Sequence, residues 1–317
     1  MKRHVTLTAI GLVLALGAAS CAQPGDMAAT NDVAIAVQDA APMAEVAARI
    51  DNFRLVSADG YARELYRLKD APAVVLVMHA AGSPDTAAVA PKLAALKAEW
   101  APKGVEFMML NSNPSEKRSA ILADAEKNGI TVPVLQDDLQ LVGGQIGASR
   151  VAQAFVIDPK TWKIAYSGPL TADPIKALVE GKSVSLKHDA LKTQAISFPA
   201  RSPEAKAQFA KISYANEIAP MIEEKCVACH QEGGIAPFGF ESYEKVKQFS
   251  GMIREAVRTD RMPPWDPDPH VGKFKDDKSL SGQQITTLIN WIEAGAPRGE
   301  GEDRLAKVKH VAPEWPL

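Results

Sequence analysis

The sequence of 317 residues contains only three cysteines, no long basic run, and no apolar segment after its N-terminal stretch that is long enough to span a bilayer. Cys21 belongs to the N-terminal segment, so Cys226 and Cys229 are the only pair left for a disulfide, a metal or a prosthetic group. Lysine and arginine nearly balance aspartate and glutamate, giving a net charge of −2, which argues against nucleic acid as a partner. The hydrophobic content of 46% is enough for real cores, and the length suggests about two domains.

Residues 1–21 have the three parts of a secretory signal. A basic start at Lys2 and Arg3 precedes a short apolar stretch, which ends in small residues before Cys21. The end of this segment resembles a bacterial lipobox, with Ala18 where leucine is commoner, and the resemblance implies that Cys21 is lipidated. The alternative is a plain cleaved signal in which Cys21 is incidental. Both interpretations place the protein on the periplasmic or outer-surface side of a bacterial membrane, and the first adds a lipid anchor.

Residues 48–182 alternate between strand and helix patterns. Continuous apolar runs at 73–78 and 104–110 predict buried strands, and 155–157 and 162–166 predict a strand pair. Helical patterns at 89–100, 115–128 and 173–180 lie between or after these strands. The alternation indicates an α/β domain. Residues 22–47, which lack periodicity, are expected to form a flexible tether before it.

The order of these elements resembles the thioredoxin fold, in its redoxin or peroxiredoxin-like branch. The family's active cysteines follow the first buried strand, where this chain has His79 and then the helix start around Pro84. Pro84 matches the family motif, but Ser83 and Thr86 (or Asp85) stand where cysteines are expected, and Ala152 stands where the family has a cis-proline. A hydroxyl cannot replace a thiolate near neutral pH. The resemblance therefore implies a thioredoxin-like domain that is redox-inactive.

His79 lies beside this turn, and two roles are open to it. A histidine there can ligate a metal, but a lone histidine is more often a structural group that hydrogen-bonds within the core.

Residues 183–212 show weak periodicity and are expected to be a linker, with a short helix near 203–209. The next segment, 213–300, contains Cys226-Val-Ala-Cys229-His230. Two cysteines three residues apart can each add to a haem vinyl group, and the adjacent histidine can then ligate the iron; C-x-x-C-H is the signature of c-type haem attachment. The alternatives are a thioredoxin-like dithiol, half of a zinc site, or chance. A zinc site needs further ligands, and no other cysteines are available.

The elements around the motif agree with a cytochrome. An amphipathic helix is expected to run into Cys226, a second helix to span 243–258, and a third to begin with a capping box at Ser281 and Gln284 and to end at Gly295. This arrangement resembles class I cytochrome c, in which the first and last helices pack around one covalent haem c. The expected architecture is thus an α/β thioredoxin-like domain at 48–182 followed by an all-α cytochrome c domain at 213–300, with a tail at 301–317.

The second axial ligand of such a haem is expected to be Met262, in the Met-Pro-Pro-Trp sequence, where two prolines stiffen the loop. Met252 is a competitor, but it falls within a helical pattern and is expected to lie in the core. His270 is the chemical alternative and would give a bis-histidine haem. The choice matters because a methionine ligand raises the reduction potential of the haem relative to a histidine ligand.

Residues 213–300 also resemble cytochrome c modules that occur beside copper type II ascorbate-dependent monooxygenase-like domains in bacteria, often after a redoxin-like domain. The shared residues are the run 233–238 and the Met-Pro-Pro-Trp sequence. The twenty residues after Pro297 are too few for a monooxygenase domain. The resemblance therefore suggests a separate redox partner protein.

Three kinds of function are compatible with these features. The first is electron transfer through a haem with two fixed ligands, with no catalytic residue. The second is a haem peroxidase or oxidase, which needs an open sixth position and is disfavoured by Met262. The third is a haem-based sensor or scaffold in which the thioredoxin-like domain docks a copper or redox enzyme.

Overall fold

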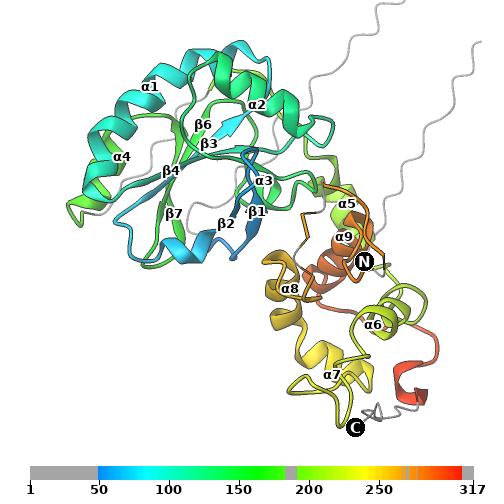
Figure 1. The fold of residues 1–317 in the computed structure, drawn as a ribbon. Coiled ribbons are helices and arrows are strands. Elements are labelled where there is room, and N and C mark those ends of the chain that lie inside the picture. The colour runs from blue at the N-terminus through cyan, green and yellow to red at the C-terminus, as the bar shows by residue number, and fades with distance from the viewer. Residues whose placement is uncertain (1–48, 183–190, 266, 269–270, 276, 309–317) are drawn as a thin grey trace, which may run out of the picture. The chain divides into compact units, whose positions relative to one another are not determined.

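The computed structural model describes residues 49–182, 191–265, 267–268, 271–275 and 277–308; the predicted signal with Cys21, the tether and His270 lie outside them. A five-stranded mixed sheet, in the order β5-β4-β3-β6-β7, forms the centre of the α/β domain (Figure 1). β3 and β5 run parallel to β4, whereas β6 is antiparallel to both β3 and β7. The strands are β3 (Val74–His79), β4 (Glu106–Asn111), β5 (Val134–Gln136), β6 (Gln153–Asp158) and β7 (Lys163–Pro169), preceded by the antiparallel pair β1 (Arg54–Val56) and β2 (Ala62–Glu64).

Two hydrophobic cores cover the two faces of the sheet. All six residues of the central strand β3 are buried, and successive side chains enter opposite cores. Val75 and Val77 pack in the core that α1, α2 and α4 share, while Leu76 and Met78 pack on the other face with α3. A strand covered on both faces needs an unbroken apolar sequence, which explains the run at 73–78. The helices are α1 (Pro84–Trp100), α2 (Arg118–Lys127), α3 (Leu141–Gln145) and α4 (Asp173–Val179), with 3₁₀ turns η1 (Leu65–Leu68) and η2 (Ala101–Lys103).

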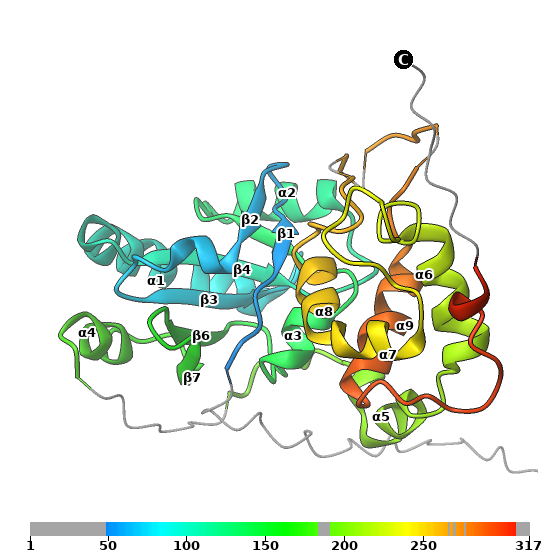
Figure 2. The same ribbon diagram turned by 90° about the horizontal axis from the view of Figure 1, so that it is seen from below.

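The rest of the described chain forms a helical part (Figure 2). A third core within it contains the fully buried rings of Tyr214 and Trp291. Trp291 Nε1 donates to the Pro297 carbonyl at 2.9 Å, so its only polar group is satisfied. The predicted capping box at the start of α9 is present. The elements are η3 (Pro199–Arg201), α5 (Pro203–Phe209), the π-turn η4 (Tyr214–Ile218), α6 (Ala219–Lys225), α7 (Tyr243–Gln248), α8 (Ser250–Arg258), α9 (Gly282–Glu293) and η5 (Leu305–Lys307).

Three details differ from the sequence-based expectation. The helix predicted over 243–258 is two helices, because the backbone leaves the helical conformation at Phe249, whose ring stacks on Phe238 at 4.0 Å. The helix predicted from Ser115 begins at Arg118, because Ser115 instead hydrogen-bonds to the Asn113 side chain. Part of the expected linker is docked: Ala195 forms a bridge with Arg150, and the apolar residues 196 and 198 pack on the α/β core.

All residues that the structure describes belong to one compact unit, Ala40–Leu317. Within the part of the chain that the structure describes, none of the helices combines the length and the apolar character needed to cross a membrane.

We expect Ser281→Ala to lower the free energy of unfolding of the helical part by about 1 kcal/mol, because it removes a capping side chain. Ser281 accepts from Gln284 N, and the Gln284 side chain accepts from Ser281 N. Urea unfolding followed by far-UV circular dichroism measures the change. Gln283→Ala, an exposed change in the same turn, is the control and should leave the midpoint unchanged; equal effects of the two variants would contradict the capping role.

Candidate functional site

A buried polar cluster occupies the position where the thioredoxin resemblance places reactive thiols. His79 ends β3, and Asn111, its register partner, ends the parallel strand β4. His79 Nε2 lies 3.1 Å from Asp124 Oδ2 of α2, and Asn111 Nδ2 donates to His79 Nδ1 at 3.0 Å. Because an amide nitrogen can only donate, Nδ1 is the acceptor, and the neutral ring carries its proton on Nε2, toward Asp124. Both ring nitrogens are therefore engaged, which favours the structural role of His79 over a metal ligand.

The loop that leads into α1 is held by carboxylates of the same cluster. Ala81 N donates to Glu116 Oε2 at 2.8 Å, and Gly82 N donates to Asp124 Oδ1 at 2.8 Å. Free backbone N–H groups at a helix start are what would bind a thiolate or another anion. Here the protein's own acids already accept from them, so this loop is closed to such a ligand.

The residues that replace the family's cysteines are themselves part of this packing. Ser83 caps α1 by accepting from Asp85 N, and Thr86 is fully buried and bonds to both the N–H and the carbonyl of Ala80. Ala152, in the cis-proline position, has a left-handed backbone with φ of 63° and donates its N–H to Met78 O at 2.9 Å. Proline has no N–H and cannot adopt this φ, so the backbone here is incompatible with the family's proline.

Burial lowers the pKa of His79 below its usual value of 6.5, although the facing Asp124 and Glu116 carboxylates oppose the shift. The unfolded chain therefore takes up a proton below pH 6.5 that the folded protein takes up only at lower pH, and stability falls as the pH falls through this window. We expect the unfolding free energy of the wild type to drop between pH 7 and 5.5, by less than about 1.4 kcal/mol per pH unit.

His79→Gln keeps hydrogen-bonding groups but does not titrate. We expect it to be less stable than the wild type at pH 7.5 and to show a flatter pH dependence, as measured by urea unfolding at several pH values. Identical slopes for the two proteins would show that His79 does not control the effect.

The C-x-x-C-H motif forms a tight loop at the end of α6. Cys229 N and His230 N both donate to Cys226 O, at 3.1 and 2.9 Å. The chain then folds back, with Ala236 N donating to Cys229 O and Phe240 N to His230 O. Gly234 allows this return, because a Cβ there would lie 2.4 Å from the Cys229 carbonyl oxygen. The motif and the residues that follow it thus form one hydrogen-bonded unit.

His230 is buried, and one of its two ring nitrogens is tied to the backbone. Its Nδ1 lies 3.0 Å from the Phe238 carbonyl oxygen, and Phe238 and Phe240 pack on the ring with centroids 4.9 and 4.7 Å away. A carbonyl can only accept, so Nδ1 carries the proton and the lone pair is on Nε2. A histidine held in this way by a backbone carbonyl is oriented to ligate a metal through its other nitrogen.

The two cysteines are free thiols in an environment unsuited to disulfide exchange. Burial, with a smaller contribution from Cys229, raises the pKa of Cys226 to about 12. The motif also follows the C-terminal end of α6, where the helix dipole disfavours an anion, whereas reactive dithiols gain from a helix N-terminus. These observations argue against the dithiol alternative, since the thiolate is the reactive species.

The candidate axial methionine lies on a separate loop after α8. Met262 N donates to Ala256 O at 3.2 Å, its side chain is 43% exposed, and the Met262–Pro263 peptide is cis. Met252 lies in α8 as expected, but its side chain is 56% exposed, so the expectation that it belongs to the core is wrong. His270 lies outside the described residues, so its role as the alternative ligand stays a prediction.

Exposed apolar side chains are concentrated in the sequence that follows the motif. Of the six large apolar side chains that are most exposed among the described residues, five fall between 235 and 274: Ile235, Met252, Met262, Val271 and Phe274. No group of three or more His, Cys, Asp or Glu side chains in the described ranges is arranged to hold a bare metal ion. The donor set of two thiols and one imidazole fits a haem attached to the chain.

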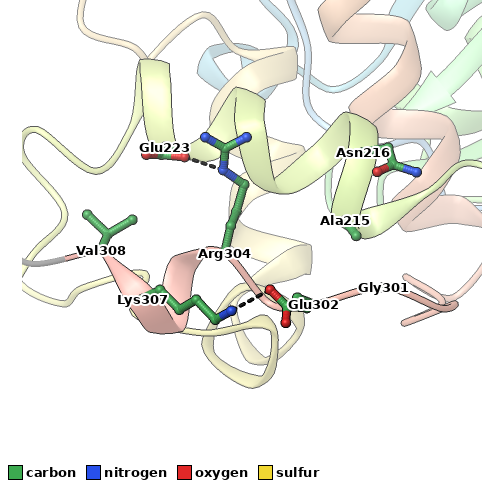
Figure 3. Close-up of a pocket in the computed structure, with 8 residues that line it drawn as sticks. All are labelled: Ala215, Asn216, Glu223, Gly301, Glu302, Arg304, Lys307 and Val308. Carbon is green, nitrogen blue, oxygen red and sulfur yellow. Dashed lines mark hydrogen bonds and ion pairs between the residues drawn. The ribbon is translucent and has the colours of Figure 1, made fainter.

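A hollow of about 490 Å³ lies elsewhere in the helical part, between η4 and the segment that ends at Val308 (Figure 3). Its charged side chains are paired with each other, Arg304 with Glu223 and Lys307 with Glu302. The pairing leaves these four groups without net charge to select an ion. The hollow includes neither cysteine of the motif nor His230.

The sequence did not reveal the hydrogen-bond partners that orient His79 and His230. Asp124 lies in a predicted amphipathic helix and Glu116 lies just before it, where charged residues are ordinary, and no local pattern links either of them to His79. The Phe238 carbonyl is a backbone group that carries no sequence signal of its own. The only available clue was the glycine pair 233–234, which permits the chain to return toward His230.

Comparison with known proteins bears on the α/β domain. Residues 45–167 match the AhpC/TSA family model. Similar solved structures include a hypothetical protein from Sinorhizobium meliloti 1021, which is 23% identical and has a TM-score of 0.42; the match covers 48% of this chain and 92% of that chain. An uncharacterized conserved protein from Geobacillus kaustophilus is 27% identical with a TM-score of 0.41, and the match covers 45% of this chain and 87% of that chain. A thioredoxin-family thiol:disulfide interchange protein from Chlorobium tepidum TLS is 21% identical with a TM-score of 0.36, and the match covers 43% of this chain and 96% of that chain. No curated protein matches the chain. With the observed strand order, the family match identifies a thioredoxin-like domain of the redoxin type.

Proposed function

We propose that the protein is an exported c-type cytochrome that transfers electrons through one covalent haem c, with a thioredoxin-like domain that has no thiol chemistry. The observation that carries the proposal is the bond from His230 Nδ1 to the Phe238 carbonyl. This bond leaves Nε2 as the nitrogen that can ligate a metal, in a histidine that directly follows two cysteines in the spacing of c-type attachment.

The chain's own residues hold and tune such a group. Cys226 and Cys229 would each form a thioether, His230 would be the proximal ligand and Met262 the distal one. The haem iron would supply reversible one-electron transfer. Phe240, which is buried, and Phe238, which is partly buried, pack on the His230 ring. They would limit the access of water to this side of the haem, which lowers the local dielectric and favours fixed ligation over exchange.

Export is the other element of the proposal. The signal pattern at residues 1–21 would direct the chain across the membrane, where c-type haem is attached, and lipidation at Cys21 would keep it at the membrane surface. The partner would be a separate redox protein that gives or accepts one electron at a time.

Expressed in a bacterium with the machinery for c-type maturation, the protein should carry one haem that remains bound after acid denaturation. We expect the pyridine haemochrome assay and intact mass to give one haem per chain in the wild type. Replacing both Cys226 and Cys229 with Ala should abolish covalent attachment. Cys21→Ser is the matched control, because it removes the third cysteine and should leave the haem content unchanged. A wild type that matures without haem would overturn the proposed function.

The distal ligand is tested by Met262→Ala against Met252→Ala, two changes of exposed methionines. We expect the methionine-to-iron charge-transfer band to vanish in the first and to persist in the second, and the reduction potential to fall only in the first. A wild type that is high-spin and reacts rapidly with peroxide would instead favour the peroxidase alternative. Persistence of the band in both variants would show that a methionine other than Met262 and Met252 is the ligand. A low-spin wild type without the band would point to His270.

A further inference from the structure

The loop that carries Met262 is fixed on its N-terminal side by the thioredoxin-like domain. Arg258, the last residue of α8, is 6% exposed, and its Nη2 donates to Gln145 Oε1 of α3 at 2.8 Å. Two residues later, Asp260 pairs with Arg54 of β1 at 3.6 Å. These two contacts precede Met262 by four and two residues.

A third contact fixes the loop on the other side of Met262. Arg118 Nη1, at the start of α2, lies 2.7 Å from Asp268 Oδ2. Both side chains are about four-fifths buried, with 20% and 22% of their surface exposed. A partly buried charged pair at this distance is stronger than the usual surface pair. The segment from 258 to 268 is therefore held at both ends by residues of the α/β domain.

The partners of this loop are themselves rigidly placed. Gln145 Nε2 donates to Asp51 Oδ2 at 2.6 Å, and Arg118 Nε donates to Gln136 Oε1 of β5 at 2.9 Å. A neighbouring charge network joins Arg254 of α8 to Asp51 at 2.5 Å and to Glu293 of α9 at 3.3 Å. The anchors thus connect the loop to a sheet strand and to two helices rather than to mobile side chains.

The loop has little structure of its own with which to hold a methionine. Among its described residues, 262–280 contain neither helix nor strand, and the Met262 side chain is 43% exposed. Ordering such a segment costs conformational entropy, and anchors that order it in advance remove that cost from ligand binding.

From these contacts we infer that Gln145 and Arg118 are positioning residues for Met262: the thioredoxin-like domain presents the distal ligand of the haem domain. The inference rests on the proposed function, because it assigns a task to the ligand set proposed there. The inference gives the thioredoxin-like domain a role in the haem site. The domain would act through the Met262 loop and not through contact with the haem.

The test uses the full-length protein with its haem attached and compares Arg118→Gln with Asp268→Asn, which break the same pair from its two ends. We expect both variants to bind added imidazole about tenfold more tightly than the wild type, a ratio equivalent to about 1.4 kcal/mol, because the competing methionine is less well held. The charge-transfer band should weaken, and hydrogen exchange in residues 256–268 should become faster. The effect of the double variant should be smaller than the sum of the two single effects, because both single variants remove the Arg118–Asp268 pair.

Arg150→Gln is the matched control, since Arg150 also donates from the α/β domain, but to Thr193 O at 3.0 Å, which lies outside the Met262 loop. Its imidazole affinity and exchange rates should equal those of the wild type. Gln145→Ala should reproduce the effect of the Arg118 change from the other end of the loop. If a variant loses overall stability, Arg118→Lys, which keeps the charge, should restore part of the band.

Imidazole affinity and exchange rates within twofold of the wild type in Arg118→Gln, Asp268→Asn and Gln145→Ala would overturn the inference. Haem content is measured first in every variant, so that loss of attachment is distinguished from loss of positioning. If the wild type carries no haem, the proposed function fails, and the hydrogen-exchange comparison alone still decides whether the α/β domain orders the loop.

Discussion

The hydrogen bond between His230 Nδ1 and the Phe238 carbonyl is the interaction on which the proposed haem site depends. It exists only because the chain returns to the motif through the turn at Gly233 and Gly234, whose tight approach to Cys229 excludes any side chain at 234. The hydrogen bonds from Ala236 N to Cys229 O and from Phe240 N to His230 O then fix the distance between the returning segment and the motif. The orientation of the His230 ring is therefore set by residues 226–240 together and not by the five-residue motif alone.

The two buried histidines among the residues that the structure describes differ in their hydrogen-bond partners. His79 has a partner at each ring nitrogen, Asp124 and Asn111, and its neutral form completes a closed network. His230 has a backbone partner at Nδ1 alone, which leaves Nε2 directed away from that bond. The first arrangement closes a buried network, whereas the second leaves one nitrogen for the proposed iron ligand.

Periodicity and caps made much of the fold predictable. The apolar run at 73–78, the helix at 203–209 and the capping box at Ser281 depend on residues close in sequence, and the structure agrees with each. The break at Phe249 was not predictable, because it depends on a ring contact with Phe238 eleven residues away. The cluster around His79 joins residues 32 to 45 positions apart, and no local pattern encodes such pairs. The exposure of Met252 was also not predictable. A helical pattern predicts the helix that contains Met252, but not which face of that helix another element covers.

A thioredoxin-like domain without thiols can still serve as a rigid support for the helical part of the chain. Its sheet is buried on both faces, so side chains at its strand ends and helix ends are fixed relative to one another. A short helical domain with long loops lacks such fixed points, and its loops must be ordered from outside or by the prosthetic group itself. Arg118 and Gln145 stand at the start of α2 and the end of α3, where a rigid scaffold can offer polar side chains without weakening its own core. The absence of cysteines from this domain leaves these features intact, because the two cores that supply the rigidity do not include residues 80–86, the loop that leads into α1.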